Sequence, residues 1–243
     1  KTGKYGRARV TGGKGTASRT LGLLGGIFAY AIDLGHIEIN PVHGVKRFAD
    51  HKNDRFLSEN ELVQLGNALR QAEAAGENYA GIAIIRLLIF TGARKGEIES
   101  LKWHEIDFER GLLRLKDSKT GQKVVALNAG TLEILAALPR IDNSEYVFPA
   151  CKGEIRGHFQ GVPKVWRKVR SLAGLNDLRL HDLRHSFASI AVSAGASLPI
   201  VGALLGHRDA ATTQRYAHLS DVPVRSVTDA VSRRLKDALR AVA

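Results

Sequence analysis

The sequence predicts a mainly α-helical protein with one small antiparallel β-sheet, an α+β fold. Over most of the chain, apolar residues recur at spacings of three and four, as on the buried face of a helix. Between residues 101 and 127 this pattern gives way to short alternating segments. Arg110 and Gly111 separate the first two of these segments, and residues 119–121 (Lys-Thr-Gly) separate the last two. Both separators are typical of hairpin turns, so we expect three antiparallel strands here and helices elsewhere.

The helices can be predicted in order along the chain. Apolar spacing predicts a first helix over residues 16–34, ended by Gly35. Ser58 and Glu61 have the spacing of a capping box, which starts another helix. Residues 79–90 are apolar on nearly all sides and predict a buried helix, followed after a Thr-Gly turn by a short one. Further helices are expected at residues 131–138, 162–172 and 221–243, and three short ones within residues 180–216.

The same patterns divide the chain into four parts. Residues 1–48 begin with a basic, glycine-rich arm, and their one or two helices cannot bury an apolar face alone. We interpret them as the end of a small helical domain whose beginning is missing. Residues 49–57 are polar and charged, as in a linker, and residues 58–220 form the larger domain. Residues 221–243 form a final amphipathic helix.

The charge of the chain indicates a polyanionic partner. Its 36 Lys and Arg residues exceed its 24 Asp and Glu residues by 12 among 243 residues. The excess favours nucleic acid over an anionic membrane, because the basic residues are scattered over many elements. No apolar run approaches the ~18 residues of a membrane span. Cys151 is the only cysteine, so an internal disulfide is excluded and a reducing compartment fits. Charge alone would also fit a merely soluble basic surface.

Residues 180–216 carry most of the residues that could do chemistry. On a helix, His181 and Arg184 share one face, and His185 extends the same cationic edge. The other face is expected to point to the core and comprises Leu180, Leu183, Phe187, Ile190 and Ala191. Further along, a Gly-His pair ends a helix at His207, and Tyr216 follows near the end of the next one.

Each candidate residue also has an ordinary structural interpretation. Arg94 and Glu97 could be a surface ion pair, or a guanidinium held by its neighbour for bidentate contact with phosphate. Lys119 could be a solvated turn lysine, or a mobile general acid. His207 could be a histidine at a helix C-terminus, and Tyr216 a half-buried packing residue.

A metal site at His181 and His185 is the other alternative, since two histidines at this spacing face one way. The residue after His181 is Asp182, so the HExxH pattern is absent, and Arg184 between the two histidines would repel a cation. No Cys or carboxylate cluster nearby offers a third ligand. We therefore expect no metal.

Together these residues follow one pattern in a fixed order. The pattern comprises Arg94 in an A-R-x-G-E box, Lys119 in a hairpin, His181 and Arg184 in H-x-x-R, His207 in L-G-H, and Tyr216 nine residues later. In this arrangement the chain resembles the tyrosine recombinases, the integrases of phages and genomic islands. The resemblance extends over almost the whole chain. Residues 16–45 resemble the end of the family's core DNA-binding domain, and residues 56–58 resemble the start of its catalytic domain.

The resemblance implies DNA recombination and integration by a metal-independent enzyme. Strands would be cut and rejoined through a 3′-phosphotyrosine intermediate at Tyr216, with no cofactor. The implied roles are phosphate binding by Arg94 and Arg184, a further hydrogen bond from His207, handling of the phenol proton by His181, and protonation of the leaving 5′-oxygen by Lys119. His185 and Glu97 would support these residues.

The family also implies partners. We expect double-stranded DNA with attachment-type sites, a homotetramer on that DNA, a monomer in isolation, and no membrane. The expected location is the bacterial cytoplasm, with the nucleoid. Residues 221–243 would dock on a neighbouring protomer or on their own domain. Two other functions remain open, a non-cleaving DNA-binding accessory protein and a strand-relaxing enzyme similar to type IB topoisomerases.

Overall fold

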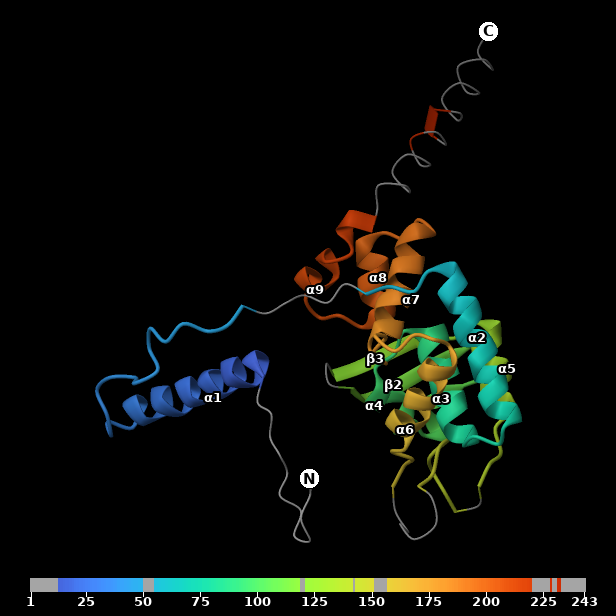
Figure 1. Cartoon of the computed structure of the whole chain (residues 1–243), viewed down its shortest axis with the longest axis horizontal. Coiled ribbons are helices and arrows are strands. Elements are labelled where there is room, and N and C mark those ends of the chain that lie inside the picture. Colours follow the sequence, from blue (N-terminus) through green and yellow to red (C-terminus); the bar gives the residue numbers. More distant parts are fainter. Residues whose placement is uncertain are drawn as a thin grey trace. The chain divides into compact units, whose positions relative to one another are not determined.

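The computed structural model describes residues 13–49, 55–118, 121–141, 143–150, 157–219, 228 and 231–232. The chain divides into two compact units, Lys1–Asn53 and Asp54–Ala243 (Figure 1). The division falls inside the polar segment of residues 49–57. Each unit is described by itself.

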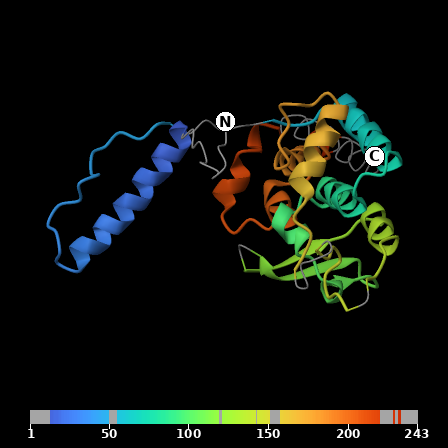
Figure 2. The same ribbon diagram turned by 60° about the horizontal axis from the view of Figure 1, so that its bottom comes forward.

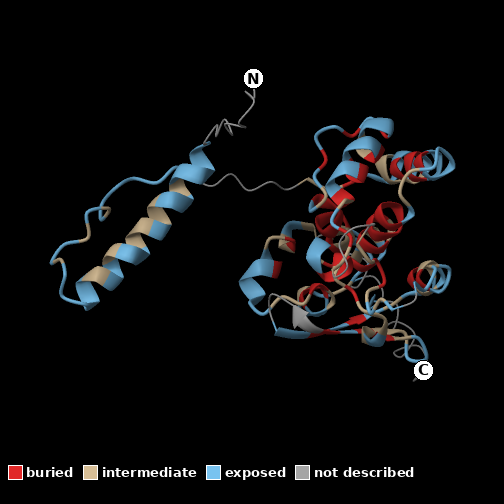
Figure 3. Cartoon of the chain, turned by 90° about the horizontal axis from the view of Figure 1, so that it is seen from below, coloured by how far each residue is buried: buried red, intermediate tan, exposed pale blue. Residues whose placement is uncertain are grey.

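The first unit is built on one helix, α1 (Lys14–Asp33), which matches the helix predicted at residues 16–34. The chain after it returns along the helix. The Asn40 side chain donates to the carbonyl of Gly25 at 3.0 Å, and the Phe48 N–H donates to Ser18 Oγ at 3.1 Å. No residue of α1 is buried, as Figure 3 shows. Within its own unit the helix is thus only partly covered, and Leu23, Ile27 and Tyr30 are exposed.

The second unit has a buried helix at its centre. The predicted capping box of Ser58 and Glu61 is confirmed and starts α2 (Glu59–Ala74). Helix α3 (Tyr79–Thr91) packs against α6 (Val162–Leu172) and α7 (Asp182–Ser193). The crossing with α6 is close, because a Cβ atom at Gly81 would lie 2.5 Å from Val165 Cγ2. Figure 3 shows the buried residues gathered on these helices.

The predicted three-stranded antiparallel sheet is confirmed. After the short helix α4 (Lys95–Glu99) and a 3₁₀ turn at Trp103–Glu105, the strands are β1 (Ile106–Asp107), β2 (Leu112–Ser118) and β3 (Gly121–Ala126). Their order is β1-β2-β3, with Leu113 opposite Ile106 on one side and Val125 on the other. These three side chains are buried. Helix α5 (Ala129–Ala136) follows, and the sheet lies along one side of the helices of this unit (Figure 2).

Three short helices follow residue 180, as predicted. They are α7, α8 (Leu198–Leu205) and α9 (Ala210–Gln214), with a 3₁₀ turn at Ala217–Leu219. A small second core forms here around Ala188, Val192, Val201, Leu205 and Tyr216. Of the helix predicted at residues 221–243, only residues 228, 231 and 232 are described.

The predicted faces of α7 need correction. Ile190, assigned to the core, is 50% exposed, whereas Arg184 and His185, assigned to an open cationic edge, are only 4% and 5% exposed. The reason is that α7 packs against both α3 and α8, so its polar side is covered as well. Among the described residues, no helix is long and apolar enough to cross a membrane.

Candidate active site

Arg94 is positioned by the turn that links α3 to α4. Gly92 ends α3 in the left-handed conformation, with φ of 59°, and Arg94 is the N-cap of α4. The Glu97 carboxylate accepts the Arg94 backbone N–H at 2.9 Å and its Nη1 at 2.8 Å. Because Glu97 is buried, this is not the loose surface pair of the alternative interpretation. The carboxylate holds the guanidinium in one orientation.

Arg184 is tied to two helix ends. Its Nη1 donates to the carbonyl of Gly92 at 2.7 Å, and its Nη2 donates to the carbonyl of Leu205 at 2.7 Å. These bonds link α7 to the ends of α3 and α8 and satisfy carbonyls that the helices leave without partners. Burial and the charge of Arg94 lower the pKa of Arg184 to about 10, so it stays cationic at neutral pH.

His207 follows the left-handed glycine that ends α8, Gly206, with φ of 67°. Its Nδ1 shares a hydrogen bond of 2.8 Å with Thr213 Oγ1, which orients the ring. Burial, followed by the charges of Arg184, Arg94 and Lys123, lowers the pKa of His207 to about 4. His207 is therefore neutral near pH 7, with the charges of Arg184, Arg94, Lys123 and Arg215 nearby.

Tyr216 lies in the turn between α9 and the final 3₁₀ turn, close to where the sequence places it. Its side chain is only 1% exposed, and its Oη shares a hydrogen bond of 2.7 Å with His185 Nδ1. His181, just before α7, packs edge-on against the His185 ring, with 4.9 Å between centroids. Burial, followed by the charges of Arg215 and His181, lowers the pKa of His185 to about 4. Burial and the charge of Arg184 also lower the pKa of His181.

Lys123 is the residue of this cluster that the sequence interpretation missed. It lies on β3, and its Nζ is 3.1 Å from Glu97 Oε2. The alternation of side chains along β3 could have identified it, because it puts Lys123 on the same buried side as Val125. A lysine at a core position of a strand is uncommon enough to single out.

The structure brings five of the six predicted site residues into one region of the second unit. Lys119 lies outside the described residues, so its expected role stays a prediction. Over the described part of the chain, no group of three or more His, Cys, Asp or Glu side chains is placed to hold a metal ion.

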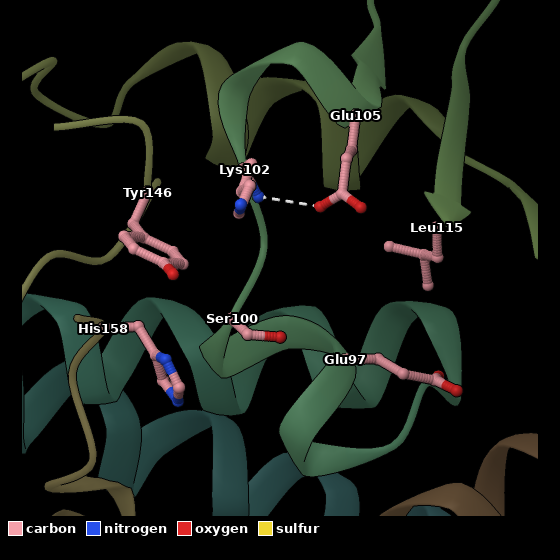
Figure 4. Close-up of a pocket in the computed structure, with 7 residues that line it drawn as sticks. All are labelled: Glu97, Ser100, Lys102, Glu105, Leu115, Tyr146 and His158. Atoms are coloured by element: carbon pink, nitrogen blue, oxygen red, sulfur yellow. Dashed lines mark hydrogen bonds between the residues drawn. The ribbon is translucent and has the colours of Figure 1, made fainter. Parts of the chain in front are cut away.

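A pocket of about 250 Å³ opens beside Glu97 (Figure 4). In Figure 4, the Glu97 carboxylate lies on the Leu115 side, away from Lys102 and Tyr146. The Lys102 ammonium pairs with Glu145 at 3.0 Å and lies 5.3 Å from the centre of the Tyr146 ring. The polar groups on that side therefore belong to a separate surface network.

The cluster can bind and activate a phosphodiester. Two guanidinium groups and a neutral imidazole offer donors for phosphoryl oxygens. The Tyr216 hydroxyl, a group capable of nucleophilic attack, lies 2.7 Å from His185 on the same helix as Arg184. Such a set of groups suits phosphoryl transfer through a covalent tyrosine intermediate.

Comparison with known proteins gives the family. The profile of the phage integrase family matches residues 55–222, more than half of the chain. The chain is 28% identical to the tyrosine recombinase XerC of Actinobacillus pleuropneumoniae over 215 residues, 86% of this chain and 69% of the relative. It is also 28% identical to the prophage integrase IntF of Escherichia coli, over 68% of this chain and 35% of that protein. The chain belongs to the phage integrase family of tyrosine recombinases, the site-specific recombinases that cut and rejoin DNA.

Solved structures share the fold. The post-cleavage complex of the XerH recombinase with a palindromic difH substrate has a TM-score of 0.68 at 22% identity, covering 88% of this chain and 67% of that one. A lambda integrase dimer bound to a COC′ core site has a TM-score of 0.62 at 22% identity, covering 86% and 60%. At this identity the likeness concerns the fold, including the small sheet beside the helices.

Proposed function

We propose that Tyr216 is the nucleophile with which this recombinase cuts DNA. One observation carries the proposal, namely that a single helix, α7, bears both Arg184 and His185. Arg184 reaches the ends of α3 and α8, close to Arg94 and His207, and His185 contacts the Tyr216 hydroxyl. One rigid element thus carries a phosphate-binding arginine and the histidine that contacts the proposed nucleophile.

In the proposed reaction, Tyr216 Oη attacks the scissile phosphorus and the bond from phosphorus to the 5′-oxygen breaks. The product is a 3′-phosphotyrosine and a free 5′-hydroxyl, so the bond energy is kept for rejoining. A phenol has an ordinary pKa of ~10 and is weakly nucleophilic at neutral pH, so its proton needs an acceptor. His185 already contacts the hydroxyl, and His181 packs on His185. We propose that the imidazole pair of His185 and His181 accepts the phenol proton of Tyr216.

The other residues stabilise charge. Arg94 and Arg184 bind the non-bridging oxygens, on which negative charge grows during attack, and His207 donates a further hydrogen bond. Lys119 protonates the leaving 5′-oxygen. The chemistry is supplied by side chains, with no metal or cofactor in any step.

The partner in this proposal is double-stranded DNA with attachment-type sites. The net charge of +12 and the likeness to a lambda integrase dimer on a core site support it.

We further propose a homotetramer on DNA, in which residues 221–243 dock on a neighbouring protomer. Sedimentation with and without the DNA site tests the assembly, and a monomer in both states would contradict it.

A suicide substrate tests the cleavage itself. DNA selected by repeated rounds of binding is nicked next to the scissile phosphate, so that the short cleaved strand diffuses away and rejoining is prevented. Wild-type protein should form a covalent protein–DNA adduct, Tyr216→Phe should form none, and Tyr79→Phe, a change at an exposed tyrosine, should behave as wild type. Absence of an adduct from the wild type would favour the non-cleaving accessory protein.

A further inference from the structure

Lys123 is a buried cation that the proposed reaction does not use. Its side chain is 4% exposed, and its Nζ lies 3.1 Å from Glu97 Oε2. Burying an ammonium is unfavourable unless a partner compensates it, and breaking such a pair leaves an uncompensated charge. Burial lowers the pKa of Lys123, an effect that Glu97 opposes and the charges of Arg184 and Arg94 reinforce. The unfavourable burial of the Lys123 ammonium therefore suggests that this lysine has a function in the site.

Glu97 connects Lys123 to Arg94. Its Oε2 accepts the Arg94 backbone N–H and the Lys123 ammonium, and its Oε1 accepts Arg94 Nη1. The carboxylate is thus held from two sides, by the start of α4 and by β3. Because Lys123 neutralises one of its oxygens, Glu97 draws the Arg94 guanidinium inward less strongly than a lone buried carboxylate would.

The stem of Lys123 packs against the turn that carries His207. A Cβ atom at Gly206 would lie 2.6 Å from both Cδ and Cε of Lys123, so only glycine leaves room for the stem. Lys123 therefore contacts two of the sequence motifs, the carboxylate of the A-R-x-G-E box and the glycine of L-G-H. Its ammonium is directed at Glu97 and shielded from solvent, so it is poorly placed to protonate a leaving group.

We propose that Lys123 is a positioning residue for DNA cleavage. It holds Glu97 so that Arg94 is aimed at the phosphate, and its stem sets the position of the Gly206–His207 turn. This inference rests on the proposed function, in which Arg94 stabilises charge on the non-bridging oxygens.

Three versions of the suicide substrate test the inference. One has the ordinary scissile phosphate, one a methylphosphonate, which removes the charge of a non-bridging oxygen, and one a 5′-bridging sulfur, which leaves without protonation. The rate of adduct formation is measured at saturating protein for wild type, Lys123→Met and the control Lys102→Met. Lys102 lines the neighbouring pocket but pairs with Glu145.

Lys123→Met should slow adduct formation at least tenfold on the ordinary and the sulfur substrates and less than threefold on the methylphosphonate. The defect shrinks there because less charge remains for Arg94 to stabilise. In a Glu97→Ala background, Lys123→Met should change the rate less than twofold, since methionine keeps a stem beside Gly206 and the lost ammonium acts through Glu97. Lys102→Met should match the wild type on all three substrates.

Other patterns overturn the inference. An equal defect on all three substrates would indicate a purely structural role, and rescue by the sulfur alone would make Lys123 the leaving-group acid. If Lys123→Met formed the adduct at the wild-type rate on all three substrates, Lys123 would have no role in DNA cleavage. If Lys123→Met does not fold, Lys123→Gln keeps an N–H donor for Glu97 and should show a smaller defect with the same substrate pattern. An inactive wild type would instead refute the proposed function.

Discussion

The hydroxyl of Tyr216 lies 2.7 Å from Nδ1 of His185, inside a side-chain environment that leaves the tyrosine 1% exposed. A phosphate under attack has to come within ~3–3.5 Å of the hydroxyl oxygen. The described conformation therefore holds the proposed nucleophile in a covered position, and DNA binding has to bring Tyr216 and the phosphate together.

The covered position predicts how Tyr216 reacts with a reagent from solvent. In the free protein, nitration should spare Tyr216 while it modifies the exposed Tyr30 and Tyr79. His185→Ala removes the hydrogen bond and should raise nitration of Tyr216 several-fold, as measured by peptide mass spectrometry. The matched control is His158→Ala, which removes a histidine next to another tyrosine, Tyr146, and should leave Tyr216 protected. Equal nitration of Tyr216 and Tyr30 in the wild type would contradict the structure.

The sequence predicts the local part of this site better than its long-range part. The Arg94–Glu97 pair follows from a spacing of three residues, and the turn at Gly206 follows from the end of an apolar helix. The contact of His185 with Tyr216 joins residues 31 positions apart, and that of Lys123 with Glu97 joins residues 26 apart. No local spacing encodes such pairs.

The burial of Arg184 shows the same limit. Its partners are backbone carbonyls, which every residue carries, so no residue type in the sequence marks them. A helical wheel sorts side chains by polarity and therefore predicts an exposed position for this arginine. In the structure Arg184 is buried, because α7 packs against both α3 and α8. The fold class and the three strands, by contrast, follow from periodicity alone.

Arg184→Lys should separate charge from geometry. A lysine keeps the charge but cannot donate to the carbonyls of Gly92 and Leu205 in the same fixed fork. We expect adduct formation to fall about 100-fold or more, as for loss of a preorganised donor, and stability to fall by ~1–3 kcal/mol. Arg86→Lys, at a more exposed pair with Glu73, should change stability by less than ~1 kcal/mol in urea unfolding. Wild-type cleavage by Arg184→Lys would contradict its assigned role.

Thr213 should matter through His207. It is buried, and its hydroxyl shares the hydrogen bond that orients the His207 ring. Thr213→Val keeps the shape and removes that bond, so we expect adduct formation to slow about tenfold, equivalent to ~1.4 kcal/mol. The neighbouring Thr212 is exposed, and Thr212→Val should leave the rate unchanged. If Thr213→Val formed the adduct as fast as Thr212→Val and the wild type, the hydrogen bond from Thr213 would not be what positions His207.

Stability should fall as the solution is acidified. The pKa of His185 and of His207 is about 4 in the folded protein, against an ordinary 6.5, so the unfolded chain binds more protons between these values. Each histidine then lowers the free energy of unfolding by up to ~1.4 kcal/mol per pH unit as pH drops from 6.5 towards 4. Urea unfolding across this range should give a shallower slope for His185→Gln than for the wild type. His104→Gln, at an exposed histidine, is the control, and identical slopes for all three would contradict the burial of His185.

The chemical linkage in the adduct is the decisive measurement for Tyr216. After reaction with the nicked substrate, the adduct is digested with protease and nuclease and the remaining nucleotide–peptide is sequenced by mass spectrometry. A 3′-phosphate esterified to Tyr216, with a free 5′-hydroxyl on the released strand, is the predicted result. Attachment to another residue, or a 5′-phosphate linkage, would contradict it.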